Sequence, residues 1–278
     1  MVPERTPDLR AFRDFEEEGW NRNATDYAGA FGRATDQFIK PLLDAAQVTS
    51  ATRLLDLACG PGNLAAAAAA RGADVVGVDI AKEMVAVARR RNPAIPFHRA
   101  PAEELPFGDR SLDAVCAGFA MHHFPDPAAA AVEVFRVLRP AGEFSFTVWS
   151  GDADKSRFFH LVSEAVKKHG TLDGSIPEGP ENFALADETL CESLLAKAGF
   201  EGMQRSEITV DLELPGPESI LDILGTTVRM RAIVEAQTEA AQRLIRADMI
   251  RATHGFDRDG IVRLPMTGVL VSAQRMAD

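Results

Sequence analysis

The sequence predicts an α/β fold: a mostly parallel sheet of seven strands, the last one antiparallel, with helices on both faces and a helical lid. Between residues 51 and 149, short apolar segments alternate with helical ones, which is the pattern of a parallel sheet covered by helices. The first apolar segment ends in Asp56 and a turn with Gly60 and Gly62, and the second ends in Asp79. A strand, a glycine turn and a helix in that order are typical of a Rossmann-like sheet that binds a nucleotide.

Strands are expected where apolar and β-branched residues gather between turn residues. They are residues 53–57, 74–78, 96–99, 112–118, 143–149, 206–214 and about 260–275. Helices are expected where apolar residues recur every three or four positions. They are residues 63–71, 81–91, 127–138, about 156–169, 187–198 and one or two helices within 218–252, with further helices in 1–50.

Residue choices support several of these boundaries. The six alanines from Ala65 to Ala70 are strong helix formers, and their small side chains permit close packing on a sheet. Pro41 suits the first turn of a new helix. The run Arg-Pro-Ala-Gly at 139–142 is expected to close one helix and lead into the alternating strand at 143–149.

Three regions are expected along the chain. Residues 1–50 would form an N-terminal helical lid, and 51–150 the cofactor-binding core. Residues 151–278 would supply substrate-side helices and the C-terminal strands that complete the sheet. The helices of 1–50, 151–185 and 218–252 are expected to gather over the cofactor edge.

Charge and composition exclude several classes of partner. The chain has 30 Lys plus Arg against 41 Asp plus Glu, a net charge of −11, and no basic cluster suited to a nucleic-acid backbone. It has no apolar run of about 18 residues, and its first 20 residues are rich in charge, so neither a membrane span nor a signal peptide is expected. Cys59, Cys116 and Cys191 show no metal-ligand or disulfide spacing and are expected in the core. We therefore expect a cytoplasmic protein with a small-molecule substrate; the oligomeric state is not predicted.

The glycine turn indicates the kind of cofactor. Residues 54–62 read LLDLACGPG, and glycine there lets the main chain bend sharply and approach a ligand. Asp79 stands where an acid usually binds the two hydroxyls of a ribose. The two glycines and Ala65 also fit the dinucleotide pattern, but Asp56 at the mouth of the turn would repel a pyrophosphate and attract a cation. The cationic nucleoside S-adenosylmethionine therefore fits better than NAD.

Five sequence blocks, in order, carry a family resemblance. They are LLDLACGPG at 54–62, VDI at 78–80, AEELPF at 102–107 followed by SLD at 111–113, MHHFPDP at 121–127 and VLRPAG at 137–142. They resemble the class I S-adenosylmethionine-dependent methyltransferases, and within them the ubiquinone and menaquinone biosynthesis group (methyltransferase type 11). The resemblance covers residues 53–149, and the flanking parts, where substrate choice resides, match only loosely.

The resemblance implies a set of site residues. Asp56 and the glycine turn would frame the methionine part of the cofactor, with Gly118 near the methionine tail. Asp79 would bind the ribose, and Ile80 and Met84 would pack on the adenine. The full set of expected cofactor-binding residues is Asp56, Ala58, Gly60, Gly62, Asp79, Ile80, Met84, Ala102, Glu103, Ala117 and, from the lid, Tyr27.

Two positions depart from the family pattern. Ala58 stands where the family usually has a glycine, which is tolerable if its φ stays below zero. Pro101 stands where the family often has an acid that accepts from the adenine amino group. That contact must be absent or supplied by Glu103, so weaker discrimination of adenine is expected.

Candidates for chemistry and for substrate binding follow the fourth strand. His122 and His123 would lie near the transferred methyl, where either can act as a general base. The alternative is that a histidine packs under the cofactor or bonds to the backbone. Phe119, Trp149 and Phe158 are candidates for an apolar substrate pocket, although ordinary core packing also explains aromatic residues at these spacings.

The sequence therefore predicts an enzyme that transfers a methyl group from S-adenosylmethionine to oxygen, carbon or nitrogen of a small, partly apolar metabolite. One alternative is an NAD(P)-dependent oxidoreductase that uses the same glycine turn. Another is a protein of this fold that binds the cofactor without methyl transfer, as a cyclase or a ligand binder. The substrate and the acceptor atom are not predicted.

Overall fold

A computed structural model describes residues 8–172 and 176–276, so residues 1–7 of the expected lid lie outside the described part. Within it, one sheet has the order β3-β2-β1-β4-β5-β8-β6, and a short strand, β7, pairs with β8. The strands are β1 (Arg53–Leu57), β2 (Asp74–Asp79), β3 (Phe97–Arg99), β4 (Leu112–Gly118), β5 (Leu138–Trp149), β6 (Phe200–Leu214), β7 (Asp257–Arg258) and β8 (Ile261–Arg275). Strands β1 to β5 pair in parallel, and β8 runs antiparallel to both β5 and β6. The predicted fold, with its last long strand reversed, is confirmed.

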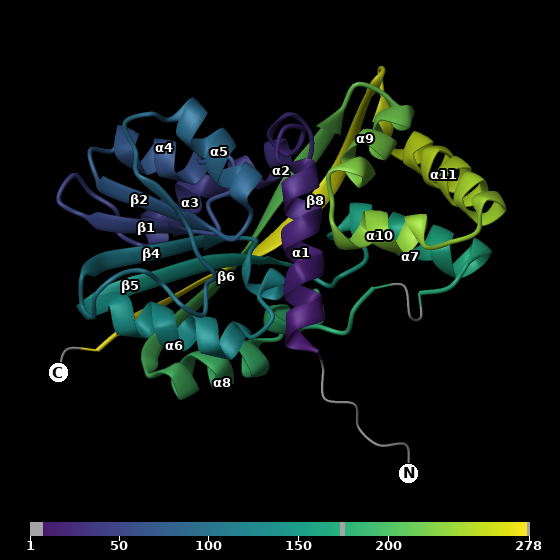
Figure 1. The fold of residues 1–278 in the computed structure, drawn as a ribbon. Coiled ribbons are helices and arrows are strands. Elements are labelled where there is room, and N and C mark those ends of the chain that lie inside the picture. The colour runs from purple at the N-terminus through teal and green to yellow at the C-terminus, as the bar shows by residue number, and fades with distance from the viewer. Residues whose placement is uncertain (1–7, 173–175, 277–278) are drawn as a thin grey trace, which may run out of the picture.

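Helices cover both faces of this sheet (Figure 1). The helices are α1 (Leu9–Asn23), α2 (Gly32–Thr35), α3 (Ile39–Ala45), α4 (Asn63–Ala70), α5 (Lys82–Arg91), α6 (Pro127–Val137), α7 (Arg157–His169), α8 (Glu188–Ala198), α9 (Ile220–Gly225), α10 (Arg229–Glu235) and α11 (Glu239–Thr253). Helices α3, α4 and α5 lie on one face, and α6 and α8 lie on the other. Helix α1 stands at the carboxyl ends of the parallel strands, where the expected cofactor site lies.

Each face of the sheet has its own apolar core. Leu42 of α3, Ala65 of α4 and Val85 of α5 pack on one face. Val134 of α6 and Leu195 of α8 pack on the other, against a different set of strand residues. Helix α3 is thus part of a sheet-covering layer, although the sequence analysis grouped it with the lid.

A third core lies beyond the main sheet. Strands β6 and β8 are each 15 residues long, and their outer halves pair with each other far past the edge of β5. Leu212 and Leu264 from this extension pack with apolar residues of α7, α9, α10 and α11. This helical group stands beside the carboxyl edge of the sheet (Figure 1), and its helices α7 and α10 contribute residues to the site described below.

Three boundaries differ from the sequence prediction. Residues 218–252 contain three helices instead of one or two, because short breaks separate α9, α10 and α11. Strand β5 begins at Leu138, since a register shift between Leu112 and Ala114 of β4 and a left-handed Ala141 (φ 63°) let residues 138–142 join the sheet. Strand β6 begins at Phe200, six residues earlier than expected. Among the described residues, no helix is long and apolar enough to span a bilayer.

The β2–β3 pair supplies a test of the packing. Gly77 lies opposite Phe97, and a Cβ at Gly77 would come within 2.4 Å of the Phe97 ring. We expect Gly77→Ala to lower the free energy of unfolding by about 1–3 kcal/mol, because the ring must move within a packed core. Denaturant unfolding measures the loss, and Phe97→Leu in the same chain should recover part of it. The control is Gly108→Ala, where a Cβ meets nothing within 4 Å; equal losses at both glycines would contradict the steric explanation.

Candidate cofactor and substrate site

The turn between β1 and α4 is held in an unusual backbone conformation. Gly60 (φ 51°) and Gly62 (φ 84°) both lie in the left-handed region, which glycine adopts without strain. A Cβ on Gly60 would meet no atom within 4 Å, because this residue faces an open cleft. A Cβ on Gly62 would instead lie 2.8 Å from Nδ2 of Asn92 and 3.1 Å from the Phe97 ring. Gly60 therefore leaves room for a ligand, and Gly62 leaves room for the protein beneath the turn.

Ala58 does not have the backbone conformation that the sequence analysis required of it. Its φ is 56°, so it lies in the left-handed region that disfavours residues with a Cβ. The condition under which alanine would be tolerable there, a φ below zero, is not met. The turn keeps the shape that suits glycine, and at Ala58 the chain carries a strained residue at the edge of the cleft.

Two buried carboxylates fix this turn. Oδ2 of Asp56 accepts from the backbone N–H of Ala65 at 2.9 Å. Oδ2 of Asp79 accepts from the N–H of Gly60 at 2.9 Å, and its Oδ1 accepts from Ala81 at 2.8 Å. The acids thus hold the glycine turn to the ends of β1 and β2, and both also line the cleft.

Burial changes the acidity of both carboxyls. Burial, together with the nearby charge of Asp79, raises the pKa of Asp56 to about 7, against the hydrogen bond from Ala65 that lowers it. Burial likewise raises the pKa of Asp79 to about 6, against the hydrogen bonds from the backbone that lower it. A positively charged ligand in the cleft would favour the ionised form of each acid.

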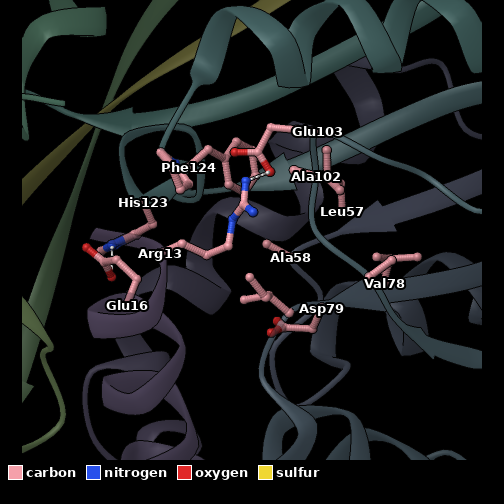
Figure 2. Close-up of a pocket in the computed structure, with 13 residues that line it drawn as sticks. Arg13, Glu16, Leu57, Ala58, Val78, Asp79, Ala102, Glu103, His123 and Phe124 are labelled. Carbon is pink, nitrogen blue, oxygen red and sulfur yellow. Dashed lines mark hydrogen bonds and ion pairs between the residues drawn. The ribbon is translucent and has the colours of Figure 1, made fainter. Parts of the chain in front are cut away.

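The cleft consists of adjacent cavities that share lining residues. One, at the ends of β2 and β3, is lined by Leu57, Ala58, Asp79, Ile80, Ala102 and Glu103 (Figure 2). A second, over the glycine turn, is lined by Tyr27, Asp36, Asp56, Gly60, Asn63 and Gly118. A third joins them and includes Met84, Phe119 and His123. The first cavity suits the adenine of an adenosyl cofactor and the second its methionine part. The third suits the ribose and the adjoining face of the adenine.

A fourth cavity, rich in aromatic side chains, adjoins the cleft. It is lined by Trp20, Tyr27, Phe31, Phe119, His122, His123, Trp149, Phe159, Asn182, Arg229 and Met230, among others. The rings of Phe119 and Trp149 stack with their centroids 3.8 Å apart. Tyr27, Trp20, Phe119 and His123 line both this cavity and the cofactor cleft. A molecule held here would lie next to the cofactor.

Most of the predicted site residues line these cavities, and three do not. Gly62 lies beneath the turn, and Ala117 is fully buried in the core of the sheet. Phe158 is also fully buried, with its ring centroid 5.5 Å from that of Phe31, and Phe159 lines the cavity in its place. The difference arises because the first turn of α7 directs neighbouring residues to different sides.

Glu103 already has partners in the protein. Its Oε1 accepts from the N–H of Asp126 at 3.3 Å, and its Oε2 lies 3.9 Å from the guanidinium of Arg13. Figure 2 shows Arg13 extended from α1 across this cavity toward Glu103. Any contact from Glu103 to an adenine amino group would have to share the carboxylate with these donors.

Sequence reasoning missed a set of polar residues outside the family blocks. They are Arg13, Glu16, Thr35, Asp36, Asn63, Asn182 and Arg229. Asn63 donates to both oxygens of Asp36 at 2.8 Å, which ties α4 to the residues before α3. A signal was present for Glu16, since a helical pattern places this acid on the same face as Phe12 and Trp20.

The cysteines are buried, as predicted. Cys59, Cys116 and Cys191 are at most 6% exposed, and burial is the largest cause of the raised pKa of each thiol. A thiol that resists ionisation is a poor nucleophile. These residues serve as packing groups in the core.

The charges in the cleft fit an adenosyl sulfonium and not a dinucleotide. Among the described residues that line the cavities over the glycine turn and beneath the ribose position, none is Lys or Arg. A pyrophosphate there would face Asp56 and Asp79 without a compensating cation. A sulfonium and an ammonium group are complementary to the same two acids.

Comparison with known proteins agrees with an S-adenosylmethionine site. Residues 55–146 match a family described as "Methyltransferase domain". The chain is 33% identical over 181 residues to a demethylmenaquinone methyltransferase of Beutenbergia cavernae, covering 60% of this chain and 73% of that protein. It is 46% identical over 91 residues to one of Chlorobaculum parvum, covering 32% of this chain and only 38% of that relative. The YcgJ protein of Bacillus subtilis, at 20% identity, shares the fold with a TM-score of 0.58 over 87% of this chain and 99% of that chain.

The fold and these matches define a class I methyltransferase. More narrowly, the chain belongs to the S-adenosylmethionine-dependent methyltransferases of the ubiquinone and menaquinone type. Its cofactor is S-adenosylmethionine, as the acids of the glycine turn predicted, and NAD is not favoured.

The raised pKa values of Asp56 and Asp79 predict a pH dependence of cofactor binding. Asp56 and Asp79 must lose their protons to complement a cation, so affinity for S-adenosylmethionine should rise about tenfold or more between about pH 5 and pH 8. The free energy of unfolding of the ligand-free protein should follow the opposite trend. Because both pKa values are raised on folding, the two acids stabilise the fold at low pH. This contribution is lost as pH rises through 6 to 7. Calorimetric titration at several pH values measures the first effect and denaturant unfolding the second. Asp56→Asn should flatten both curves, and an unchanged slope would contradict the assignment.

Proposed function

We propose that this protein transfers a methyl group from S-adenosylmethionine to a small, partly apolar metabolite that contains a ring. The observation that carries the proposal is the aromatic cavity, which adjoins the cofactor cleft and shares Tyr27, Phe119 and His123 with it. An acceptor in that cavity would lie beside the reactive end of the cofactor, as methyl transfer requires.

The aromatic lining of the cavity favours a flat acceptor. Stacked Phe119 and Trp149, with Phe31 and Phe159 beside them, offer ring faces and edges to an aromatic molecule. The relatives named above are demethylmenaquinone methyltransferases, so we infer that a quinol-type ring is the best first candidate. Asn182, whose Oδ1 accepts from Arg229, would fix the orientation of the acceptor.

The residues of the site would have separate tasks. Bound S-adenosylmethionine supplies a methyl group on a positively charged sulfur. Asp79 would hold the ribose, Asp56 and Asp36 would face the positive methionine end, and Met84 with Ile80 would pack against adenine. His122 and His123 would lie at the acceptor side, where a proton can be taken up.

The proposal also assigns a role to each of the three regions of the chain. We infer that residues 1–50 up to α3 act as a lid, that 51–150 is the cofactor-binding core, and that 151–278 forms the acceptor side and completes the sheet. Buried thiols and the acidic balance of the chain support a cytoplasmic location. A small molecule is the only partner that we propose.

Calorimetric titration with S-adenosylmethionine, followed by turnover with 1,4-naphthohydroquinone, tests the function. We expect binding in the micromolar to sub-millimolar range and formation of S-adenosylhomocysteine together with a methylated product. Tight binding without any methylated product from a panel of hydroxylated rings would favour the cyclase or ligand-binding alternative. Enhanced NADH fluorescence, with no binding of S-adenosylmethionine, would favour an oxidoreductase.

The role of Asp79 has its own test. We expect Asp79→Ala to weaken binding of S-adenosylmethionine by about 1–3 kcal/mol, because polar groups of the ligand lose their partner. Asp74→Ala, at the exposed start of the same strand, is the matched control. Calorimetry measures both, and an affinity that Asp79→Ala leaves unchanged would remove this residue from the site.

A further inference from the structure

A buried charged cluster joins three distant parts of the chain beside the aromatic cavity. Glu16 of α1 is 3% exposed and lies between His123, which follows β4, and Arg229 of α10. Its Oε2 is 2.9 Å from Nδ1 of His123, and its Oε1 accepts from Nε of Arg229 at 2.6 Å. Figure 2 shows Glu16 and His123 directed toward each other at the mouth of the site. A carboxylate so enclosed needs both partners.

Glu16 stays ionised in this position. Burial alone would raise the pKa of its carboxyl, but His123 and Arg229 together outweigh burial and hold that pKa below its usual range. An ionised carboxylate can only accept hydrogen bonds. Nδ1 of His123 must therefore carry the proton that it shares with Glu16.

The other ring nitrogen of His123 is left as an acceptor. In a neutral imidazole with its proton on Nδ1, the lone pair is on Nε2. Among the described residues, no side chain or backbone group is hydrogen-bonded to Nε2. His123 lines both the cofactor cleft and the aromatic cavity, so its ring lies at the boundary across which a methyl group would pass.

The other ionisable groups at this boundary are either paired or neutral. Arg229 neutralises Glu16 and uses its other donors on the backbone oxygens of Pro180 and His122 and on Oδ1 of Asn182. Burial holds the pKa of His122 well below its usual value, with help from His123 and Arg229, so this ring is neutral. The cavity thus offers no unpaired charge to an acceptor, which favours an uncharged one.

We propose that His123, oriented by Glu16, removes the proton from a hydroxyl group on an uncharged aromatic acceptor. This inference rests on the proposed function and names its acceptor class. His123 would be the catalytic residue, and Glu16 a positioning residue that also stabilises the imidazolium. The arrangement selects His123 over His122, whose Nδ1 is buried without a hydrogen-bond partner and which lines only the aromatic cavity.

The step balances as follows. Nε2 takes the hydroxyl proton, the oxygen lone pair forms the new bond to the methyl carbon, and the methyl–sulfur bond breaks with its electron pair left on sulfur. The imidazolium then returns its proton to water, so one proton is released per turnover. If the ring carbon beside the hydroxyl takes the methyl group, the ring hydrogen leaves as a proton and the oxygen regains one, and the net release is the same.

The first test needs no cofactor. The absorbance of 4-nitrophenol reports its ionisation, and His123 with Glu16 should bind it as an imidazolium–phenolate pair below the pH at which it ionises in water. We expect the ionised fraction of the bound phenol at about pH 6 to fall about tenfold in Glu16→Gln. The substitution Glu16→Gln alters only one of the titratable or charged groups that face His123. The others are His122, Arg229 (through Glu16), and Arg13 and Asp79 across the cavity. No ionised signal from the unmodified protein at millimolar phenol would overturn the proposal.

The second test compares acceptors by turnover. With 1,4-naphthohydroquinone, Glu16→Gln should lower kcat about tenfold and His123→Asn by about 100-fold or more. With 4-nitrophenol at a pH where it is already ionised, both variants should stay within about threefold of the unmodified protein, because no proton has to be removed. The acidic limb of the pH–rate profile should also move to lower pH in Glu16→Gln.

The matched control is Glu18→Gln, which makes the same change on the exposed side of α1. It should leave the spectrum and both rates unchanged. Equal losses with neutral and ionised acceptors in Glu16→Gln would show that Glu16 only supports the fold, and would overturn the proposal. Absence of S-adenosylmethionine binding in the unmodified protein would instead contradict the proposed function, so the two failures are distinguishable.

Discussion

The turn between β1 and α4 is the constraint on which the rest of the site depends. Its left-handed residues bring the main chain to the edge of the cleft, and Asp56 and Asp79 hold it there by accepting from backbone N–H groups. Because the same carboxylates line the cleft, the groups that fix the backbone also give the cleft the negative charge that favours a cation. Structure and specificity thus rest on two buried acids whose raised pKa values reflect the cost of burying them.

The sequence was sufficient for the parts that depend on local pattern. The order of strands and helices, the turn at 54–62 and its two acids followed from apolar spacing, glycines and charge, whereas most other cleft-lining residues were implied by the family resemblance. The φ of Ala58 was not predictable in this way, since the sequence shows a residue that normally avoids the conformation that the turn imposes. The early start of β5 depends on a bulge, which residue preferences alone do not reveal.

The acceptor side was less predictable because it is assembled from distant segments. Glu16 and Arg229 are 213 positions apart in the chain, and nothing in either local pattern indicates that they pair. Phe159, and not Phe158, faces the cavity because of the exact rotation of α7 on its support, the long β6–β8 extension. Sequence periodicity identifies an apolar face, but it does not fix which of two adjacent rings reaches a cavity.

Helix α1 has a consequence for the order of events. Its residues Arg13, Glu16 and Trp20 line cavities on the nucleoside side and on the acceptor side alike. A displacement of this one helix would therefore unseal both compartments together, and its return would dehydrate both. If this helix moves as the proposed lid, exchange of spent cofactor and release of product would both depend on the same movement.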